Sequence, residues 1–404
     1  MEQILGWLSL LFIFIFVILF TRKNPEAKNF LLIAFLLRSL CVIISEYGLF
    51  ILPDSQDDAY TFEIQAREFS RNYGYKIFYQ FHHLDSLLIS RIISIFYTLF
   101  GESKMMAQTI SVALGTASVY LVYYLTMMLW DAHVAKKAAW VTTLFPTLVL
   151  YSSLTLREVY IVFFLLVGLI GIEKFIKSNS VNSFLQIILS FYILIYFHGA
   201  VAFGGLIFLL YLSLKLVKKQ LVQLNKLKMN INSFIFVCLL SVPIILFLID
   251  RFNIPYLPSV YDLTFVLFEA NISNTNTTSY PDWLKINSFI DLFIKMIPRF
   301  LYFLYSPFIW NIKSLYHVVG LLDGILYFIM TIYIIKNWHS IWANPASRFF
   351  LVLFIVYAII HGLGVGNFGT GIRHRSKFVV ILIILAAPKI HKFIFSNNKK
   401  LYKN

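Results

Sequence analysis

A short acidic stretch, Asp54-Ser-Gln-Asp57-Asp58-Ala-Tyr60, follows the second long apolar segment of the chain. Ionisable side chains that a membrane protein keeps beside the bilayer are candidate functional groups. A carboxylate that faces an acceptor hydroxyl can take its proton as a general base. We therefore predict that Asp57 and Asp58 are catalytic. The alternative is structural: Asp58 would only cap the helix that begins near Tyr60.

The residues after this stretch could bind other parts of a substrate. Tyr60, Arg67 and Arg71 recur at helical spacings, which would place one phenol and two guanidinium groups on a single face. Tyr60 and Arg67 are therefore predicted substrate contacts. His82 and His83 could join the acidic pair to hold a divalent metal, although adjacent histidines seldom ligate one ion. No cofactor is certain from the sequence, and these two histidines are a weak metal candidate.

Two more polar pairs lie at the ends of predicted membrane helices on the same side. Arg157-Glu158 separates the fourth and fifth of these helices, and His198-Gly199 marks the next turn. Arg157 is a candidate ligand of a donor phosphate, whereas Glu158 and His198 are candidate substrate contacts. The alternatives are an arginine that extends to the interface and a structural boundary histidine.

A glycine-rich turn, Gly362 to Gly371, precedes Arg373-His374-Arg375. Its G-x-G-x-x-G pattern follows a membrane helix and has no βαβ unit around it, which argues against a dinucleotide site. Exposed backbone N–H groups and guanidinium forks suit a phosphate or pyrophosphate instead. We predict that these three residues bind the donor phosphate. The alternative is a basic cluster that meets lipid headgroups.

The composition indicates an integral membrane protein. Of the 404 residues 59% are hydrophobic and 13% are charged, and the mean hydropathy is +0.78. Soluble domains carry roughly 25% charged residues. Several apolar runs reach the about 18 residues that a membrane helix needs, and such runs exclude a transmembrane β-barrel.

We predict one all-α, polytopic membrane domain over residues 1–404. Two larger extracytoplasmic loops, 53–105 and 250–315, are expected to carry interfacial helices over 84–100 and 289–310. About eleven membrane helices are predicted at 4–21, 29–52, 106–129, 138–153, 159–174, 183–198, 200–216, 232–249, 316–335, 349–363 and 376–388.

The net charge of +15 fits a membrane orientation and requires no nucleic-acid partner. With the N-terminus outside, more than half of the lysines and arginines lie in predicted cytoplasmic loops, as the positive-inside rule requires. The acidic stretch then faces the extracytoplasmic side. The abundance of lysine, phenylalanine, isoleucine and asparagine is typical of an AT-rich bacterial genome, which points to the inner membrane.

The run Asp57-Asp58-Ala-Tyr60, with Ala66-Arg-Glu-Phe69 and Gly74-Tyr75, resembles the first external loop of GT-C superfamily glycosyltransferases. These membrane enzymes include protein mannosyltransferases and lipid A aminoarabinose transferases. Here Asp-Asp replaces the commoner Asp-Glu. The resemblance covers about the first 175 residues and implies a GT-C-like fold and a polyprenyl-phosphate-linked sugar donor.

The sequence thus predicts an extracytoplasmic glycosyltransferase that uses a polyprenyl-(pyro)phosphate donor and a glycan, lipid or protein acceptor among membrane lipids. Arg157, Arg373 and Arg375 would neutralise the leaving phosphate. One alternative is an O-antigen or capsule polysaccharide polymerase or ligase that uses pyrophosphate-linked oligosaccharides. A more distant one is a transporter or flippase of such lipids, although no inverted repeat is visible.

Overall fold

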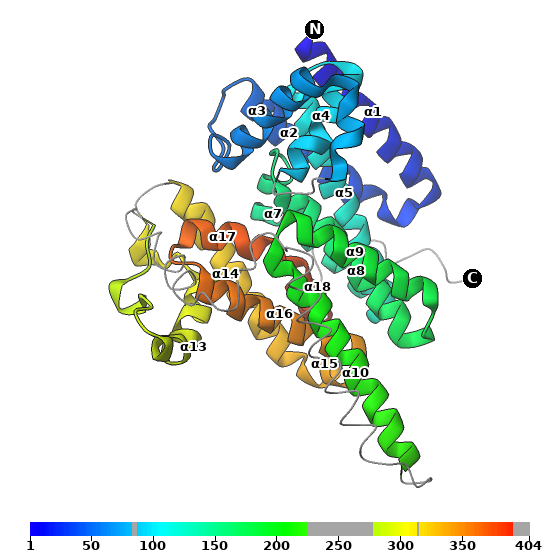
Figure 1. Cartoon of the computed structure of the whole chain (residues 1–404), viewed down its shortest axis with the longest axis vertical. Helices are drawn as coiled ribbons and strands as arrows, with labels where there is room; N and C mark the ends of the chain where they lie inside the picture. Colours follow the sequence, from blue (N-terminus) through cyan, green and yellow to red (C-terminus); the bar gives the residue numbers. More distant parts are fainter. Residues whose placement is uncertain (83–86, 225–277, 313–314, 391–404) are drawn as a thin grey trace, which may run out of the picture.

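The computed structural model describes residues 1–82, 87–224, 278–312 and 315–390. In this part of the chain the elements are α-helices and short 3₁₀-helices, and the only β pairing is an isolated bridge between Ser279 and Asn367. The predicted all-α class is therefore confirmed for the described residues (Figure 1). The predicted helix over 232–249 lies outside them.

Six described helices are long and apolar enough to cross a membrane. They are Glu2–Lys23 (α1), Pro25–Glu46 (a 3₁₀ turn and α2, Lys28–Glu46), Lys104–Leu129 (α5), Arg157–Ser178 (α8), His317–Lys336 (within α14, Leu315–Lys336) and Pro345–Gly364 (α16). Four more apolar helices are shorter: Leu88–Phe100 (α4), Val181–Phe197 (α9), Gly199–Lys215 (the start of α10, Ala202–Leu224) and Val379–Lys389 (containing α18, Val379–Ala386).

The fourth predicted membrane helix is broken. It consists of α6 (Ala132–Leu144) and α7 (Pro146–Tyr151), which are separated by an extended Phe145. Pro146 causes the break because its ring disfavours a helical conformation in the preceding residue. The short helix α7 contacts α8, and the buried residues 152–156 connect it to the start of α8 at Arg157.

The first predicted loop contains α3 (Asp58–Tyr73), a 3₁₀ segment (Gly74–His82) and α4. At 1.5 Å per residue, the 13 residues of α4 extend roughly 20 Å, which is short of a bilayer core of about 30 Å. This length agrees with a helix that does not span. It packs on α3, where Tyr97 donates to Glu63 and Ser90 to the carbonyl of Phe62.

In the second predicted loop, residues 250–277 lie outside the described part of the chain, and residues 289–310 hold one long helix in place of the expected pair. Helix α13 (Phe289–Tyr305) is followed by the 3₁₀ turn Ile309–Asn311 and packs against α14 and α16. Two short helices, α15 (Trp338–Ala343) and α17 (Phe368–Ser376), flank α16 in the chain.

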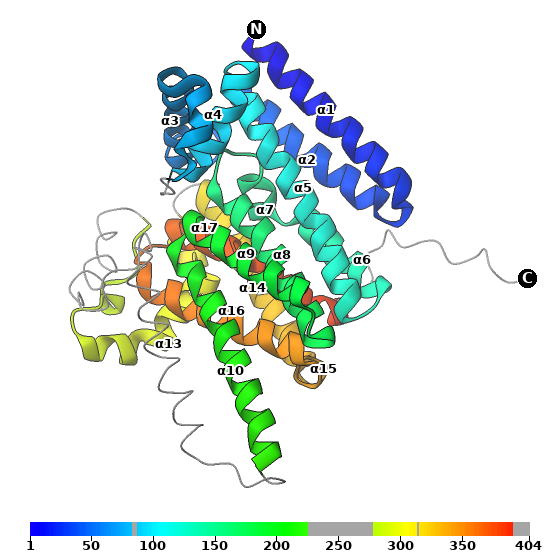
Figure 2. The ribbon, with the colours of Figure 1, turned by 45° about the vertical axis from the view of Figure 1, so that its right-hand side comes forward.

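Basic residues gather at one end of the helices. Lys136 pairs with Glu26 at 3.1 Å, Lys137 donates to the carbonyl of Ile390, and Lys177 donates to that of Met128. Helix α8 runs from this end to Arg157, a length of roughly 33 Å for its 22 residues. The predicted site residues on α3, α8 and α17 therefore lie at the opposite end of the bundle (Figure 2).

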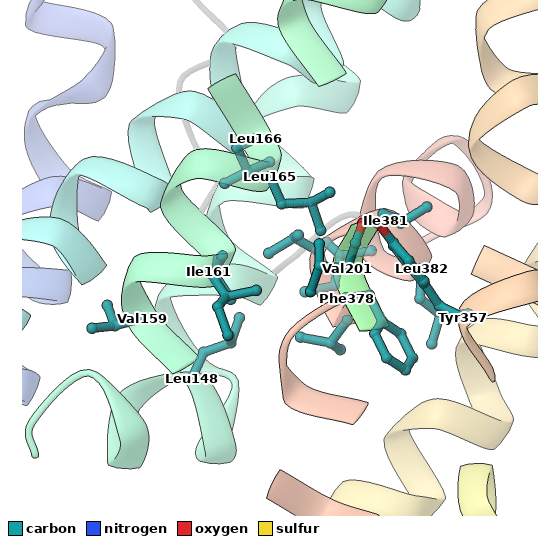
Figure 3. Close-up of a cluster of buried hydrophobic side chains, with 14 of the residues drawn as sticks. Leu148, Val159, Ile161, Leu165, Leu166, Val201, Tyr357, Phe378, Ile381 and Leu382 are labelled. Atoms are coloured by element: carbon teal, nitrogen blue, oxygen red, sulfur yellow. Dashed lines mark hydrogen bonds between the residues drawn. The ribbon is translucent and has the colours of Figure 1, made fainter. Parts of the chain in front are cut away.

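The core connects the two halves of the chain. Leu148, Ile161 and Leu165 from α7 and α8 face Phe378, the N-cap residue of α18, and Ile381 within α18 (Figure 3). Every residue of α18 is buried, so this helix is hydrophobic on all sides and lies in the interior. Packing of α8 against this centre brings residues 158 and 373 together.

Candidate active site

A cavity of about 370 Å³ opens where three segments of the predicted site meet. Six of the predicted site residues line it, together with three others. The predicted ones are Asp57, Asp58, Arg157, Glu158, Arg373 and His374; the others are Asp54, Gly369 and Thr370. They come from the segment before α3, from the first turns of α3 and α8, and from the first and last turns of α17. The fold therefore assembles a polar cavity from residues up to 320 positions apart in the sequence, Asp54 and His374.

Helix α17 presents the basic side chains to the cavity. The carboxamide of Asn367 caps the helix by accepting from the backbone N–H of Thr370 at 2.7 Å. The end of α16 just before it is held by Arg299, whose buried guanidinium donates to the carbonyls of Gly362, Leu363 and Val365. The sequence does not single out Arg299, because three of its four carbonyl partners lie more than 60 residues away.

Arg373 is the centre of the charge network in the cavity. Its Nη1 lies 2.7 Å from Asp58 Oδ2 and its Nε lies 2.8 Å from Glu158 Oε1. Lys377 Nζ lies 3.7 Å from the same Glu158 oxygen. Burial lowers the pKa of Arg373, but the Glu158 and Asp58 carboxylates outweigh burial and raise it. Arg373 is therefore charged, and it holds both carboxylates in place.

Arg157 is the cation of the cavity with fewer hydrogen-bond partners than Arg373. Its Nε is buried and has no hydrogen-bond partner among the described residues. The guanidinium lies over the ring of Phe62, 5.8 Å from its centroid. It also lies at the first position of α8, where unpaired backbone N–H groups favour an anion. This arrangement suits a phosphate that enters from outside.

The acidic stretch does not behave as a helix cap. Asp57 occupies the cap position of α3, but its side chain makes no capping hydrogen bond, and Asp58 turns to Arg373. Asp54 also lines the cavity, and its Oδ2 is buried without a hydrogen-bond partner. Burial raises the pKa of Asp54, and the positive charge of Arg373 offsets part of that rise. The spacing of residues gave no reason to select Asp54.

A histidine–lysine cluster lies behind the cavity. His374 Nδ1 is 3.2 Å from both His361 Nδ1 and Lys377 Nζ, and the His198 ring lies 5.1 Å from that of His374. Burial lowers the pKa values of His374 and Lys377. His198 thus contacts a site residue and does not line the cavity. Within the described ranges, no group of three or more His, Cys, Asp or Glu side chains is arranged to hold a metal ion.

Besides His198, three predicted site residues lie away from the cavity. Arg375 is fully buried and pairs with Asp323 at 2.6 Å, so its guanidinium holds the helices together and cannot reach a phosphate in the cavity. Arg67 pairs with Glu2 and Glu63 at 2.7 and 2.5 Å. Tyr60 is exposed on α3.

The proposed metal pair cannot be placed. His83 lies outside the described residues, and the surroundings of the His82 side chain are likewise outside them.

A second cavity of about 390 Å³ adjoins the first. The two share Asp54 and Asp57 in their linings. The rest of the second lining is mainly apolar: Phe50, Ile51, Leu52, Pro53, Gln56, Leu150 and Val319. The polar cavity therefore continues into a mostly apolar one, and two aspartates lie at the boundary.

No protein-family model matches this chain, and no curated protein is significantly similar to it. The resemblance of residues 57–75 to GT-C enzymes therefore stays a prediction. What the cavity can bind follows from its own side chains.

Proposed function

We propose that this protein is an integral-membrane glycosyltransferase of GT-C-like architecture, which moves a sugar from a polyprenyl-(pyro)phosphate donor to an acceptor. One observation carries the proposal: a polar cavity that contains both guanidinium and carboxylate groups adjoins an apolar cavity. A lipid-linked sugar has the same order of parts, namely a hydrocarbon chain, a phosphate and a hydroxyl-rich ring.

Each part of such a donor has a matching surface. The first isoprene units would lie against Phe50, Leu52 and Leu150, which line the apolar cavity. The phosphate would accept charge-assisted hydrogen bonds from Arg157 and Arg373. Ionised carboxylates only accept hydrogen bonds, so the aspartates suit the hydroxyl groups of a sugar or an acceptor.

The arrangement supports displacement at the anomeric carbon. Negative charge builds up on the phosphate oxygen as the glycosidic bond breaks, and the two arginines would stabilise that charge. The buried carboxylate of Glu158 pairs with the Nε of Arg373 and so holds the guanidinium in place. Because Arg373 is held before substrate arrives, little reorganisation is needed during the reaction.

The orientation follows from the charge distribution. The basic end of the bundle, with Lys136, Lys137 and Lys177, would face the cytoplasm, and the cavity would open on the extracytoplasmic side of a bacterial inner membrane. The acceptor would then be a glycan, lipid or protein on that side.

Labelling of single cysteines tests this orientation. In a background with Cys41 and Cys238 replaced by alanine, we expect a membrane-impermeant maleimide to label Tyr79→Cys in intact cells. Asn179→Cys should react only after permeabilisation, because Asn179 lies at the basic end of α8. Both native side chains are exposed, so accessibility is matched. The opposite labelling pattern would place the cavity in the cytoplasm.

Phosphate binding tests the role of Arg157. We expect Arg157→Gln to weaken the binding of undecaprenyl phosphate by about tenfold or more, because a hydrogen bond to a charged group contributes about 1.5–3 kcal/mol. Binding would be measured on protein in lipid nanodiscs. Arg71→Gln is the control, because Arg71 is exposed and pairs with Glu102 outside the cavity. Equal affinities for Arg157→Gln and wild type would refute this phosphate position.

A further inference from the structure

We propose that Asp54, and neither Asp57 nor Asp58, is the general base that takes the proton of the acceptor hydroxyl. The inference rests on the proposed glycosyl transfer and assigns a residue within it. It starts from the position of Asp54, whose side chain lines both the polar and the apolar cavity. The reacting bond of a lipid-linked donor would lie at this boundary.

The three aspartates differ in what their oxygens already bind. Asp58 Oδ2 lies 2.7 Å from Arg373 Nη1, so this carboxylate is already engaged in an ion pair. Asp57 is exposed to solvent. Asp54 Oδ2, in contrast, is buried and has neither an ion-pair partner nor a well-formed hydrogen bond in the described part of the chain, although the Tyr151 hydroxyl faces this carboxyl group. A buried acceptor without a partner costs free energy, and an acceptor hydroxyl would supply the missing hydrogen bond.

The backbone at Asp54 supports the assignment independently. Its φ is +60°, in the left-handed region that L-residues other than glycine seldom adopt. Observed outliers of this kind gather at active sites, where the surrounding structure holds them. Asparagine tolerates the same conformation, so Asp54→Asn should remove the base and keep the turn.

Several charged and polar groups face Asp54 from neighbouring elements. Burial raises its pKa, and Glu158 of α8 and the adjacent Asp57 add to that rise; Arg373 of α17 and the Tyr151 hydroxyl of α7 offset part of it. A base whose pKa is closer to the working pH is better matched to proton transfer. Because only the ionised carboxylate accepts a proton, turnover should fall as the pH drops through the pKa of Asp54.

The step balances as follows. The acceptor oxygen forms a bond to the anomeric carbon of the sugar while its proton moves to Asp54. The bond between that carbon and the phosphate oxygen breaks, and its electron pair stays on the phosphate. The products are the glycosylated acceptor, a polyprenyl (pyro)phosphate and a protonated Asp54, which returns its proton to water.

Turnover of the variants tests the assignment. We expect Asp54→Asn to lower kcat by at least about 100-fold, the lower end of what a general base contributes, while its affinity for undecaprenyl phosphate stays within about threefold of wild type. Asp57→Asn should lose less than about tenfold. Asp54→Glu should recover part of kcat and shift the acid limb of the pH–kcat profile. Undiminished turnover in Asp54→Asn would overturn the assignment.

A second measurement separates this inference from the proposed function. A hydrophobic carbodiimide modifies protonated carboxyl groups in apolar surroundings, and peptide mapping locates the product. We expect modification at Asp54 in preference to Asp57 and Asp58, with protection by undecaprenyl phosphate. Protection without turnover of any donor in wild type would refute the glycosyl transfer. Turnover in wild type with no modification of Asp54 would refute only its role as the base.

Discussion

Replacement of Arg373 by alanine is expected to lower kcat for sugar transfer by about 1000-fold. Removal of a single donor to a developing negative charge costs about 100- to 1000-fold in other enzymes. Arg373 also holds Asp58 and Glu158, through contacts of 2.7 and 2.8 Å, so its loss would release two more cavity residues. The upper end of the range is therefore expected, measured as single-turnover transfer in nanodiscs.

Two controls separate charge from folding in this experiment. Arg373→Lys keeps the positive charge but cannot bridge both carboxylates, so it should recover only part of the rate. Arg71→Ala removes an exposed arginine outside the cavity and should behave as wild type. A rate for Arg373→Ala within a few-fold of wild type, with the protein folded, would refute the role of Arg373.

The second large effect concerns stability. Arg375→Met should reduce the stability of the folded protein by about 3–5 kcal/mol, because loss of one partner leaves a buried charge unpaired. Asp323 would lose its 2.6 Å contact with Arg375 and keep only the hydroxyl of Thr147. The carbonyls of Leu304 and Ser306 would also lose a donor.

This effect would be measured as a decrease in the temperature at which half of the detergent-solubilised protein is no longer monodisperse. The double variant Arg375→Met/Asp323→Leu should recover part of the loss, since it removes the uncompensated carboxylate and leaves only the backbone carbonyls and the Thr147 hydroxyl without their partners. If Arg375→Met were as stable as wild type but failed to bind undecaprenyl phosphate, Arg375 would be a phosphate ligand, as its sequence position predicts.

The different fates of Arg373 and Arg375 show where spacing alone falls short. Both were predicted to bind phosphate because they follow a glycine-rich turn. Residues 368–376 form a helix, and side chains two positions apart on a helix point to different faces. Arg373 therefore faces the cavity while Arg375 faces the core. The sequence does not predict this helix, because it contains Gly369 and Gly371 and glycine disfavours helices.

Local sequence patterns predict the long helices well, but they do not predict which side chains contact one another across the fold. Apolar run length identified the long helices, and the acidic stretch, Arg157 and Arg373 were each singled out. Arg67 lies away from the cavity, where it pairs with Glu63 of its own helix and with Glu2 and Glu102 of other segments. Asp54 was missed for a different reason. Its importance comes from a positive φ and from burial at a cavity boundary, which residue spacing does not encode.

The central claim is tested most directly by sugar transfer with purified wild-type protein in nanodiscs. Donors would be polyprenyl monophosphates bearing single hexoses or pentoses and polyprenyl pyrophosphates bearing oligosaccharides, and an Arg373→Ala sample would serve as the inactive control. We predict transfer from a monosaccharide donor that stops in the control. Turnover of oligosaccharide pyrophosphates alone would indicate a polymerase or ligase. Binding of donors without any turnover would contradict the glycosyltransferase and favour a transporter.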